Sequence, residues 1–274
     1  AEYEDILANE KSLKNVIRKE LDSIKKEFGS QRKTIVEDAK EAVYVAAPIK
    51  EETVYFVMDR FGYSKTMDKA TYQRNKDNIL KEYKFIVPCM NTDKICVFTN
   101  LGLMHQIKVL DLPYGKFRDK GIPIDNLSNY DSSEENFIYI INLGAIIHSR
   151  LLFGTKTAML KMVDGSEFDV AKRTTASTKL NEDDELLIVH AMTGEETVVM
   201  QSEKEMFLRI EASTIPEKKK GAVGVRGMKL NAGDALSNIY VLDGENEQTV
   251  EVKGKEVVLN RLRVGNRDTK GTKR

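Results

Sequence analysis

The stretch EKKKGAVGVRGMKL, residues 217–230, places a run of basic side chains beside regularly spaced glycines. Its basic residues are Lys218, Lys219, Lys220, Arg226 and Lys229, and its glycines stand at 221, 224 and 227. Lysine and arginine bind phosphate oxygens, and glycine lets a backbone approach a phosphate closely. The stretch therefore predicts a phosphate loop of a nucleotide enzyme, a solvated turn, or part of a surface that holds a polyanion.

The glycine spacing does not match the loops that bind nucleotides. Glycines three apart form neither G-x-G-x-x-G nor G-x-x-x-x-G-K-[ST]. The stretch also lies between strand-like patterns, so no helix N-terminus is expected there to receive a phosphate. A loop that contacts the phosphates of a polyanion is favoured over a nucleotide site.

Residues that commonly carry catalysis or bind metals are scattered. His105 and His190 lie in strand-like patterns and His148 ends one, with no H-x₃-H, H-E-x-x-H or G-x-S-x-G motif. The acidic run NEDDELL at 181–187 is predicted as a solvated turn before a strand. Among 43 carboxylates nothing singles out an acid–base pair. We therefore expect neither an active site nor a metal site in this chain.

The composition indicates a soluble globular chain with a charged surface. Apolar residues make up 41% and charged residues 31% of 274, enough for one large domain or two smaller ones. No apolar run approaches the roughly 20 residues of a membrane helix, and no signal peptide is recognisable. The spacing of Cys89 and Cys96 fits neither a zinc site nor a disulfide framework, so we expect buried thiols in a reducing cytoplasm.

The net charge is zero, with 43 basic and 43 acidic residues, but the charge is unevenly distributed. Segments 216–230 and 260–274 are both basic. The second contains Arg261, Arg263, Arg267, Lys270, Lys273 and Arg274 against Asp268. Two basic clusters near one end fit a polyanion-binding face, although charge alone leaves a solvated surface with a frayed tail equally open.

The elements that would position these residues begin with a helix. Apolar residues at 13, 17, 21, 24 and 28 form one stripe at helical spacing, and Gly29 suits a left-handed C′ position. Residues 30–42 predict a short second helix, with Ser30 as a candidate cap. One narrow stripe requires a partner, and the sequence opens without methionine. We therefore expect this chain to be cut from a longer polypeptide.

From Val43 onward the pattern changes to strands that recur in hairpins. Five hairpins begin near 53, 94, 150, 196 and 248, each with an apolar strand, a short turn and a second strand carrying Lys or Arg. Further strands are predicted at 84–90, 136–147, 185–192 and 238–242. The recurrence predicts a repeat of about four strands in five units, which must pack face to face to cover its apolar surfaces. An all-β domain with ordinary hairpins is the alternative.

Three segments resemble the A subunit of bacterial type IIA topoisomerases. EFGSQRKTIVED at 27–38 is similar to the tail of its coiled coil, and CVFTNLGLMHQIKVLDLP at 96–113 resembles the T-x-x-G hairpin of its C-terminal blades. KKKGAVGVRGMKLNAGD at 218–234 is close to G-x-x-A-x-G-V-R-G-[IM]-x-L-x-x-G-D and is the most specific match. The final segment, 260–274, also looks familial. The resemblance covers essentially the whole chain.

The resemblance implies a mainly β fold: a propeller-like β-pinwheel of about five four-stranded blades at 43–274, preceded by the helical end of a coiled coil at 1–42. It implies a domain without catalysis that binds duplex DNA on its basic rim and presents it to the breakage-reunion core. The catalytic tyrosine and the ATPase would lie elsewhere, so neither Tyr63 nor Tyr72 is the nucleophile. Part of the glycine content of 221–227 would serve tight packing between blades.

For the complete enzyme, the resemblance implies ATP-dependent strand passage with Mg, a B subunit and a second A subunit as partners, and a place in the bacterial cytoplasm with the nucleoid. No cofactor and no membrane contact are expected for this chain. A propeller that docks proteins without binding DNA is the alternative function.

One departure separates the two branches of the family. Gyrase A subunits carry a box of the form Q-R-R-G-G-R-G after the first hairpin, whereas this chain reads YQRNKDNILKEYK at 72–84. Gln73 and Arg74 match, but Asn75 and Lys76 replace arginine and glycine. Loss of the box favours topoisomerase IV-like behaviour, and gyrase-like behaviour remains open.

Sequence-independent DNA binding requires basic residues along a path of phosphates. If the hairpins project from a disc, the second strands and their flanks place on its rim Lys65, Lys69, Lys108, Lys116, Lys161, Arg209, Arg261 and Arg263. Arg74 and Lys76 of the degenerate box, and the basic residues of 217–230, complete the predicted site. We predict steep salt dependence, little sequence preference, and larger losses from charge reversal at 218–220 than at 182–184.

Overall fold

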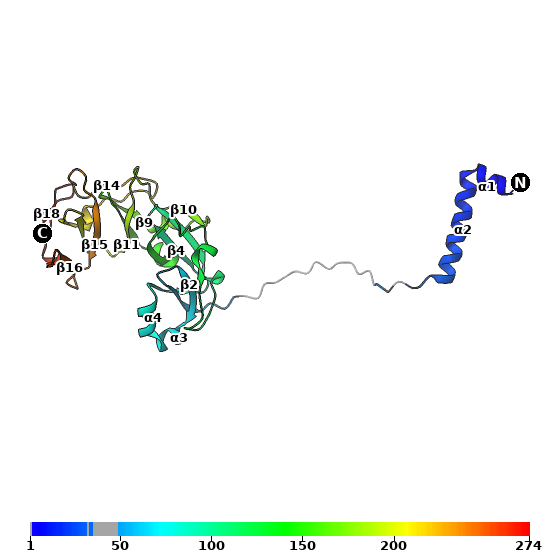
Figure 1. Cartoon of the computed structure of the whole chain (residues 1–274), viewed down its shortest axis with the longest axis horizontal. Helices are drawn as coiled ribbons and strands as arrows, with labels where there is room; N and C mark the ends of the chain where they lie inside the picture. Colours follow the sequence, from blue (N-terminus) through cyan, green and yellow to red (C-terminus); the bar gives the residue numbers. More distant parts are fainter. Residues whose placement is uncertain (1, 32, 35–48) are drawn as a thin grey trace. The chain divides into compact units, whose positions relative to one another are not determined.

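The computed structural model describes residues 2–31, 33–34 and 49–274, which fall into two compact units (Figure 1). The first unit is Ala1–Ile49 and the second is Lys50–Arg274. Of the predicted second helix at 30–42, residues 32 and 35–42 lie outside the described residues, as does the predicted domain boundary at 42/43. Residues 30, 31, 33 and 34 are not helical, so the predicted start of that helix at Ser30 is wrong.

The first unit contains helices α1 (Glu2–Ala8) and α2 (Glu10–Phe28). Asn9 separates them and caps α2, because its side chain accepts a hydrogen bond from the N–H of Lys11 at 3.1 Å. The predicted apolar stripe lies on α2, and its side chains are exposed, from 41% at Leu13 to 74% at Phe28. The prediction of a left-handed Gly29 is wrong: Gly29 has φ −67° and ends the helix by donating its N–H to the carbonyl of Lys25 at 3.0 Å.

The second unit is mainly β and is built from four sheets that share one plan, here called blades A to D. Each begins with a hairpin: β1–β2 (Thr53–Met58, Tyr63–Asp68), β4–β5 (Lys94–Thr99, Leu103–Lys108), β8–β9 (Arg150–Thr155, Met159–Asp164) and β12–β13 (Thr197–Ser202, Met206–Glu211). A third strand pairs with the first strand of each hairpin: β3 (Phe85–Met90), β7 (Phe137–Asn142), β11 (Leu186–Met192) and β15 (Leu236–Leu242). These strands confirm the predicted hairpins and the strands between them.

The fourth strand of each blade is short and comes from beyond the next hairpin in the sequence. These strands are β6 (Ile122–Pro123), β10 (Thr174–Ala176), β14 (Val225–Arg226) and β18 (Thr272–Lys273). For example, β6 follows β5 of blade B but pairs with β2 of blade A. The fifth unit is only the hairpin β16 (Thr249–Val252) and β17 (Lys255–Val258), so the expectation of a fifth four-stranded blade is wrong.

Short helices join the strands. Helices α3 (Lys69–Arg74) and α4 (Lys76–Glu82) follow β2, and α5 (Leu143–Ile146) occupies the end of the predicted strand 136–147, which leaves His148 in a turn. One-turn 3-10 helices are η1 (Val109–Asp111), η2 (Ile124–Asn126), η3 (Gly165–Phe168), η4 (Ala212–Thr214) and η5 (Leu259–Arg261).

Strand alternation explains why the blades stack. In β4, Ile95 and Val97 pack in the cluster between blades A and B, whereas Cys96 and Phe98 pack between blades B and C. Successive strand residues point to opposite faces, so a continuous apolar run buries both faces of one sheet. The result is a series of blades along an open arc (Figure 1).

The two cysteines are the buried thiols that the sequence predicts. Burial raises the pKa of Cys89 to about 11 and that of Cys96 to about 12. Both thiols are therefore protonated at neutral pH and serve as small apolar core residues.

Candidate nucleic-acid interface

The segment that leads to each short fourth strand is a loop that recurs once per blade. We call these loops connectors A (112–121), B (169–173), C (215–224) and D (262–271), after the blades to which they lead. Connectors A, C and D run parallel to the second strand of their blade, through the bridges Thr66–Tyr114, Met162–Glu217 and Arg209–Val264. The same local geometry is thus repeated from blade to blade.

Every connector carries more basic than acidic residues. The basic residues are Lys116, Arg118 and Lys120 in A, Lys172 and Arg173 in B, Lys218, Lys219 and Lys220 in C, and Arg263, Arg267 and Lys270 in D. Each connector contains a single acid: Asp119, Asp169, Glu217 and Asp268. Positive charge therefore recurs at one structural position in four successive blades, although the chain as a whole is neutral.

The surroundings of the glycines in 217–230 show whether these residues serve packing or lie open to a ligand. A Cβ on Gly224 would stand 2.7 Å from the carbonyl oxygen of Leu160, and one on Gly227 would stand 2.6 Å from the Leu160 side chain. A Cβ on Gly121 or Gly271 would likewise stand too close to the backbone of Ser64 or Phe207, respectively. Gly221 has no atom within 4 Å of its Cβ position. Two of the three glycines therefore allow close packing on β9, and one lies in open space.

Lys161 on β9 is buried beneath connector C, with a residue exposure of 1%. Its Nζ donates hydrogen bonds to the carbonyl oxygens of Lys219 (3.2 Å), Lys220 (2.7 Å) and Ala222 (2.8 Å). The ammonium also lies 5.5 Å from the centre of the Phe153 ring. Burial lowers the pKa of Lys161 to about 8, opposed by the negative charge of Glu167.

Lys65 on β2 has the same position beneath connector A and the same exposure of 1%. Its Nζ donates to the carbonyl oxygens of Lys116 (3.0 Å), Phe117 (2.7 Å) and Asp119 (2.6 Å). Burial lowers its pKa, opposed by the negative charges of Asp119 and Glu82. The placement of Lys65 and Lys161 on an exposed rim is therefore wrong, because both ammonium groups are committed to backbone carbonyls.

Arg209 on β13 is half-buried, and its guanidinium group also donates hydrogen bonds within the protein. Its Nε donates to Thr197 Oγ1 at 3.0 Å, and its Nη1 donates to the carbonyls of Asn260 and Leu262. These bonds tie β13 to η5 and to the start of connector D. Arg209 therefore supports a connector rather than lining a rim, which corrects its predicted placement.

The three lysines of connector C differ from one another. Lys219 has a side-chain exposure of 87%, and its Nζ lies 3.4 Å from Glu167 Oε1. Lys220 is anchored: its Nζ donates to the Glu167 carbonyl at 2.7 Å, and its N–H donates to the Glu167 carboxylate at 2.9 Å. Lys218 is half-buried. Lys219 is thus the most available of the three for a phosphate.

Connector D contacts the end of β14, the short strand that follows connector C. The N–H of Asp268 donates to the carbonyl of Gly227 at 2.8 Å, and Arg267 Nη1 donates to the carbonyl of Arg226 at 2.9 Å. Arg226 Nη1 in turn lies 3.4 Å from Asp268 Oδ1, in an exposed ion pair that contributes little stability. Arg226 of the predicted site therefore lies beside Arg267, which the prediction did not include in the site.

The degenerate box segment forms α3 and α4, which cover the outer face of blade A. Tyr72 stacks on Tyr55 with ring centres 3.9 Å apart, and Ile79 is fully buried among Val57 and Met67. Lys69, Arg74 and Lys76 are exposed on these helices. Arg74 and Lys116 line one open hollow of about 800 Å³, together with Arg118, Asp68 and Asp119.

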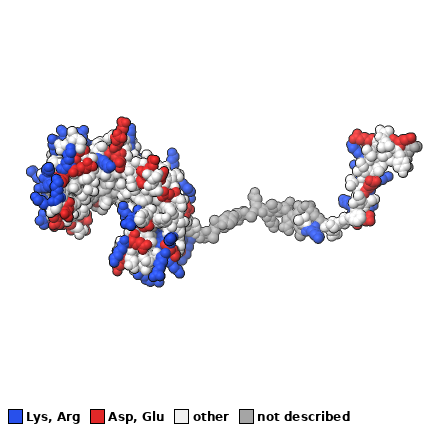
Figure 2. Space-filling view, viewed as in Figure 1, with Lys and Arg blue, Asp and Glu red and all other residues white. Residues whose placement is uncertain are grey.

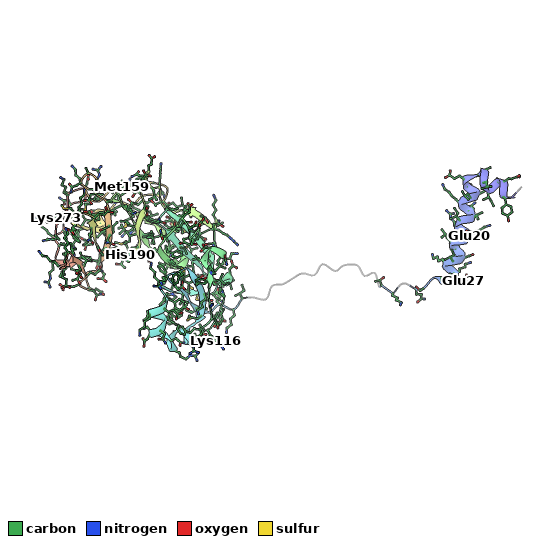
Figure 3. All side chains as sticks on the ribbon, in the orientation of Figure 1. Glu20, Glu27, Lys116, Met159, His190 and Lys273 are labelled. Atoms are coloured by element: carbon green, nitrogen blue, oxygen red, sulfur yellow. The ribbon has the colours of Figure 1, made fainter. Side chains whose placement is uncertain are left out.

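The other predicted residues are exposed at separate places. Lys108 ends β5 near Arg173 and Asp111, Lys229 follows β14, and Arg263 lies in connector D. Arg261 pairs with Glu247 at 3.1 Å, again in an exposed position. Lys116 and Lys273 lie near opposite ends of the second unit (Figure 3). The structure thus distributes the predicted residues along the blades rather than gathering them in one pocket.

Sequence reasoning missed the basic residues Arg118, Lys120, Lys172, Arg173, Arg267 and Lys270 as members of one recurring site. The signal was present, because Y-G-K-F-R-D-K-G, E-K-K-K-G-A-V-G and V-G-N-R-D-T-K-G align once the final glycine is taken as the anchor.

Basic and acidic side chains alternate over the visible face, and basic ones are dense at the end carrying α3 and α4 and at the C-terminal end (Figure 2).

The predicted solvated turn at 181–187 holds for Glu182 and Asp183 but not for Asp184. Asp184 is buried, and its carboxylate accepts hydrogen bonds from the N–H and the hydroxyl of Thr157. It stabilises the turn between β8 and β9.

Within the described part of the chain, no helix is long and apolar enough to span a membrane, and no group of three His, Cys, Asp or Glu residues is placed to hold a metal.

Comparisons with known proteins agree with this architecture. Residues 149–190 and 196–243 match the family model described as the DNA gyrase C-terminal domain, a beta-propeller. Each matched stretch contains one hairpin, a connector and a third strand. The DNA gyrase A subunits of Staphylococcus epidermidis and Lawsonia intracellularis are each 28% identical, over 99% and 98% of this chain. The chain spans 32% and 35% of those proteins, about a third of their length.

Solved structures share the fold. The C-terminal domain of a DNA topoisomerase IV aligns with a TM-score of 0.73 at 21% identity, covering 82% of this chain and 73% of that one. The C-terminal domain of E. coli ParC gives 0.64 at 16%, covering 81% and 94%, and that of a DNA gyrase A gives 0.55 at 17%, covering 81% and 76%. These findings confirm the resemblance of the chain to the C-terminal domain of the A subunit of bacterial type IIA topoisomerases.

Proposed function

We propose that this chain is the part of a type IIA topoisomerase A subunit that binds duplex DNA without sequence preference and bends it toward the breakage-reunion core. The observation that carries the proposal is the recurrence of a basic connector at the same place in four blades. Phosphates follow one another along a duplex, so a repeated basic loop matches the repeated charge of its ligand.

The energetics of such a surface are adequate for bending. Bending a short duplex costs of order 1–6 kcal/mol by elastic estimates. About six to ten phosphate contacts, which the connectors can supply, offset that cost at low salt and lose about 10³–10⁵ in affinity between 50 and 200 mM salt. Little sequence preference is expected, because backbone contacts do not read bases.

The branch of the family is assigned from α3 and α4. In place of a glycine-rich box that could contact DNA with its backbone, this chain has two helices whose buried Ile79 and stacked Tyr72 cap blade A. We therefore assign a topoisomerase IV-like role, in which the domain steers strand passage during decatenation and relaxation. Lys69, Arg74 and Lys76 remain on the surface of the cap and are available to DNA.

For the complete enzyme, the proposal includes ATP hydrolysis with Mg, a B subunit, a second A subunit and a cytoplasmic, nucleoid-associated location. This chain supplies none of the covalent chemistry. Tyr72 is engaged in the stack with Tyr55, and Tyr63 lies on β2 of blade A, where the described residues form no group of three His, Cys, Asp or Glu side chains placed to hold a metal.

The test uses relaxed closed-circular plasmid, this chain and a nicking-closing enzyme at low salt, followed by gel analysis of linking number. Binding in a mobility assay without a change in linking number is the expected result. A shift that grows with protein would establish wrapping with a defined hand and overturn the topoisomerase IV-like assignment. Neither binding nor a shift would overturn the DNA role and favour a propeller that docks proteins.

A further inference from the structure

Two of the four connectors are wrapped around a buried lysine. Lys65 and Lys161 occupy the third position of their strands, and each donates to three carbonyls at matching places, 116, 117 and 119 in connector A and 219, 220 and 222 in connector C. An ammonium has three N–H donors, so each lysine is fully satisfied by its connector.

The arrangement is not an ion pair. Among the described residues, neither ammonium has a carboxylate oxygen within salt-bridge distance, and the backbone carbonyls alone replace its water shell. A buried charge without a paired ion is costly, and an apolar residue would fill the same space at lower cost. Blade D shows that it can be so filled, because Leu208 holds the third position of β13 and packs in the core.

The ammonium determines the shape of its connector. Three carbonyls of a short loop can converge on one point only if that point carries donors, since converging carbonyls repel one another and buried acceptors require partners. With its carbonyls turned inward, connector C leaves the side chain of Lys219 87% exposed. Connector A likewise leaves Lys116 and Arg118 exposed.

Blade B uses a different solution at the same position. His105 occupies the third position of β5, and its ring nitrogens contact Thr174 Oγ1 at 3.1 Å and Glu135 Oε2 at 3.0 Å. Its connector is also shorter and is followed at once by β10. Of the four blades, A and C are thus the two in which a fully buried lysine lies beneath the connector.

We propose that Lys65 and Lys161 are positioning residues for DNA binding, each holding one basic connector in the conformation that presents its outward side chains to phosphates. The inference rests on the proposed function and adds residues that touch no DNA themselves. Each lysine is expected to act only through its own connector: Lys161 through Lys218 and Lys219, and Lys65 through Lys116 and Arg118.

The test is a pair of double-mutant cycles on binding to linear duplex DNA of mixed sequence, measured over a range of salt. Lys161→Met is combined either with Lys218→Gln and Lys219→Gln, or with Lys116→Gln and Arg118→Gln. Alone, Lys161→Met should weaken binding and reduce the slope of log K against log salt by about 1 to 2. Its effect should fall below about twofold once Lys218 and Lys219 are replaced, and should persist in full when connector A is altered.

The matching cycle with Lys65→Met should give the reverse pattern, with its effect lost in the connector A background. Urea unfolding establishes that each variant is folded, and Lys161→Gln replaces Lys161→Met if the latter does not fold. Equal losses in both backgrounds would show a general structural effect and overturn the inference alone. If the connector variants by themselves leave binding unchanged, the proposed interface fails and the inference fails with it.

Discussion

Gly224 lies against the backbone of Leu160 so closely that a Cβ on residue 224 would stand 2.7 Å from the Leu160 carbonyl oxygen. Gly221, three residues earlier in the same connector, has open space around it. We expect Gly224→Ala to destabilise the protein by about 1–3 kcal/mol through overpacking. Gly221→Ala should change the free energy of unfolding by less than about 0.5 kcal/mol. Urea unfolding of both variants measures the contrast, and equal effects would contradict the packing role of the later glycine.

The cap on blade A should behave as a structural element. Ile79 on α4 is fully buried, whereas its neighbour Leu80 is 56% exposed. Ile79→Ala should cost about 2–5 kcal/mol, and Leu80→Ala should stay within about 0.5 kcal/mol. Thermal or urea unfolding distinguishes them. A small loss for Ile79→Ala would mean that the box segment is a loosely attached loop and not a packed cap.

Acid should remove a contribution that Glu196 makes to stability. Burial raises the pKa of its carboxyl group, but hydrogen bonds from Thr193 and Gly194 outweigh burial and lower the pKa from 4.5 to about 2. The folded state thus releases this proton more readily than the unfolded state. The contribution is present above pH 4.5, is lost as the pH falls toward 2, and amounts to about 3 kcal/mol at about 1.4 kcal/mol per unit of pKa.

The measurement is the free energy of unfolding of the wild type and of Glu196→Gln from pH 7 to pH 2. The variant should be less stable at pH 7, and the difference should shrink toward pH 2. A difference that stays constant with pH would mean that the loss comes from geometry and not from the carboxylate charge.

The thiols of Cys89 and Cys96 should resist alkylation in the folded protein. Their pKa values, raised by burial to about 11 and about 12, leave almost no thiolate at pH 8. Mass spectrometry after iodoacetamide treatment should show no modification without denaturant and two modifications in urea. Rapid labelling of the native protein would contradict the stacking of blades A, B and C around these residues.

The sequence predicted the long strands well because their apolar residues alternate or run continuously, as in KICVFT. It did not predict β6, β10, β14 and β18, since two or three residues carry no periodicity and each pairs with a strand that precedes the intervening hairpin in the sequence. The apolar run 136–147 also concealed α5, because the four residues Leu143–Ile146 are too few to show a helical period.

The sequence predicted that the site is basic, but it did not predict which basic residues are exposed. A basic loop between blades was predicted at 217–230, but Lys65 and Lys161 were assigned to the surface because the second strands of the hairpins were expected to line the rim of a disc. The spacing of apolar residues in the two strands could have predicted their burial. Lys161 lies two residues from Met159 and from Val163, and Lys65 lies two residues from Met67. Because side chains alternate between the faces of a strand, both lysines point to the same face as these apolar residues. Which lysine of a run is anchored, as Lys220 is by Glu167, depends on a contact between distant segments that the sequence does not reveal.

The connectors are proposed to bind the phosphates of DNA. The most direct test compares Lys218→Gln with Lys219→Gln, made together, against Lys50→Gln with Lys255→Gln, two exposed lysines outside the connectors. Both pairs remove the same charge, so long-range attraction falls equally. We predict that the connector pair reduces the salt slope of duplex binding by about 1 to 2 and that the control pair leaves this slope nearly unchanged. Equal reductions for the two pairs would contradict this prediction.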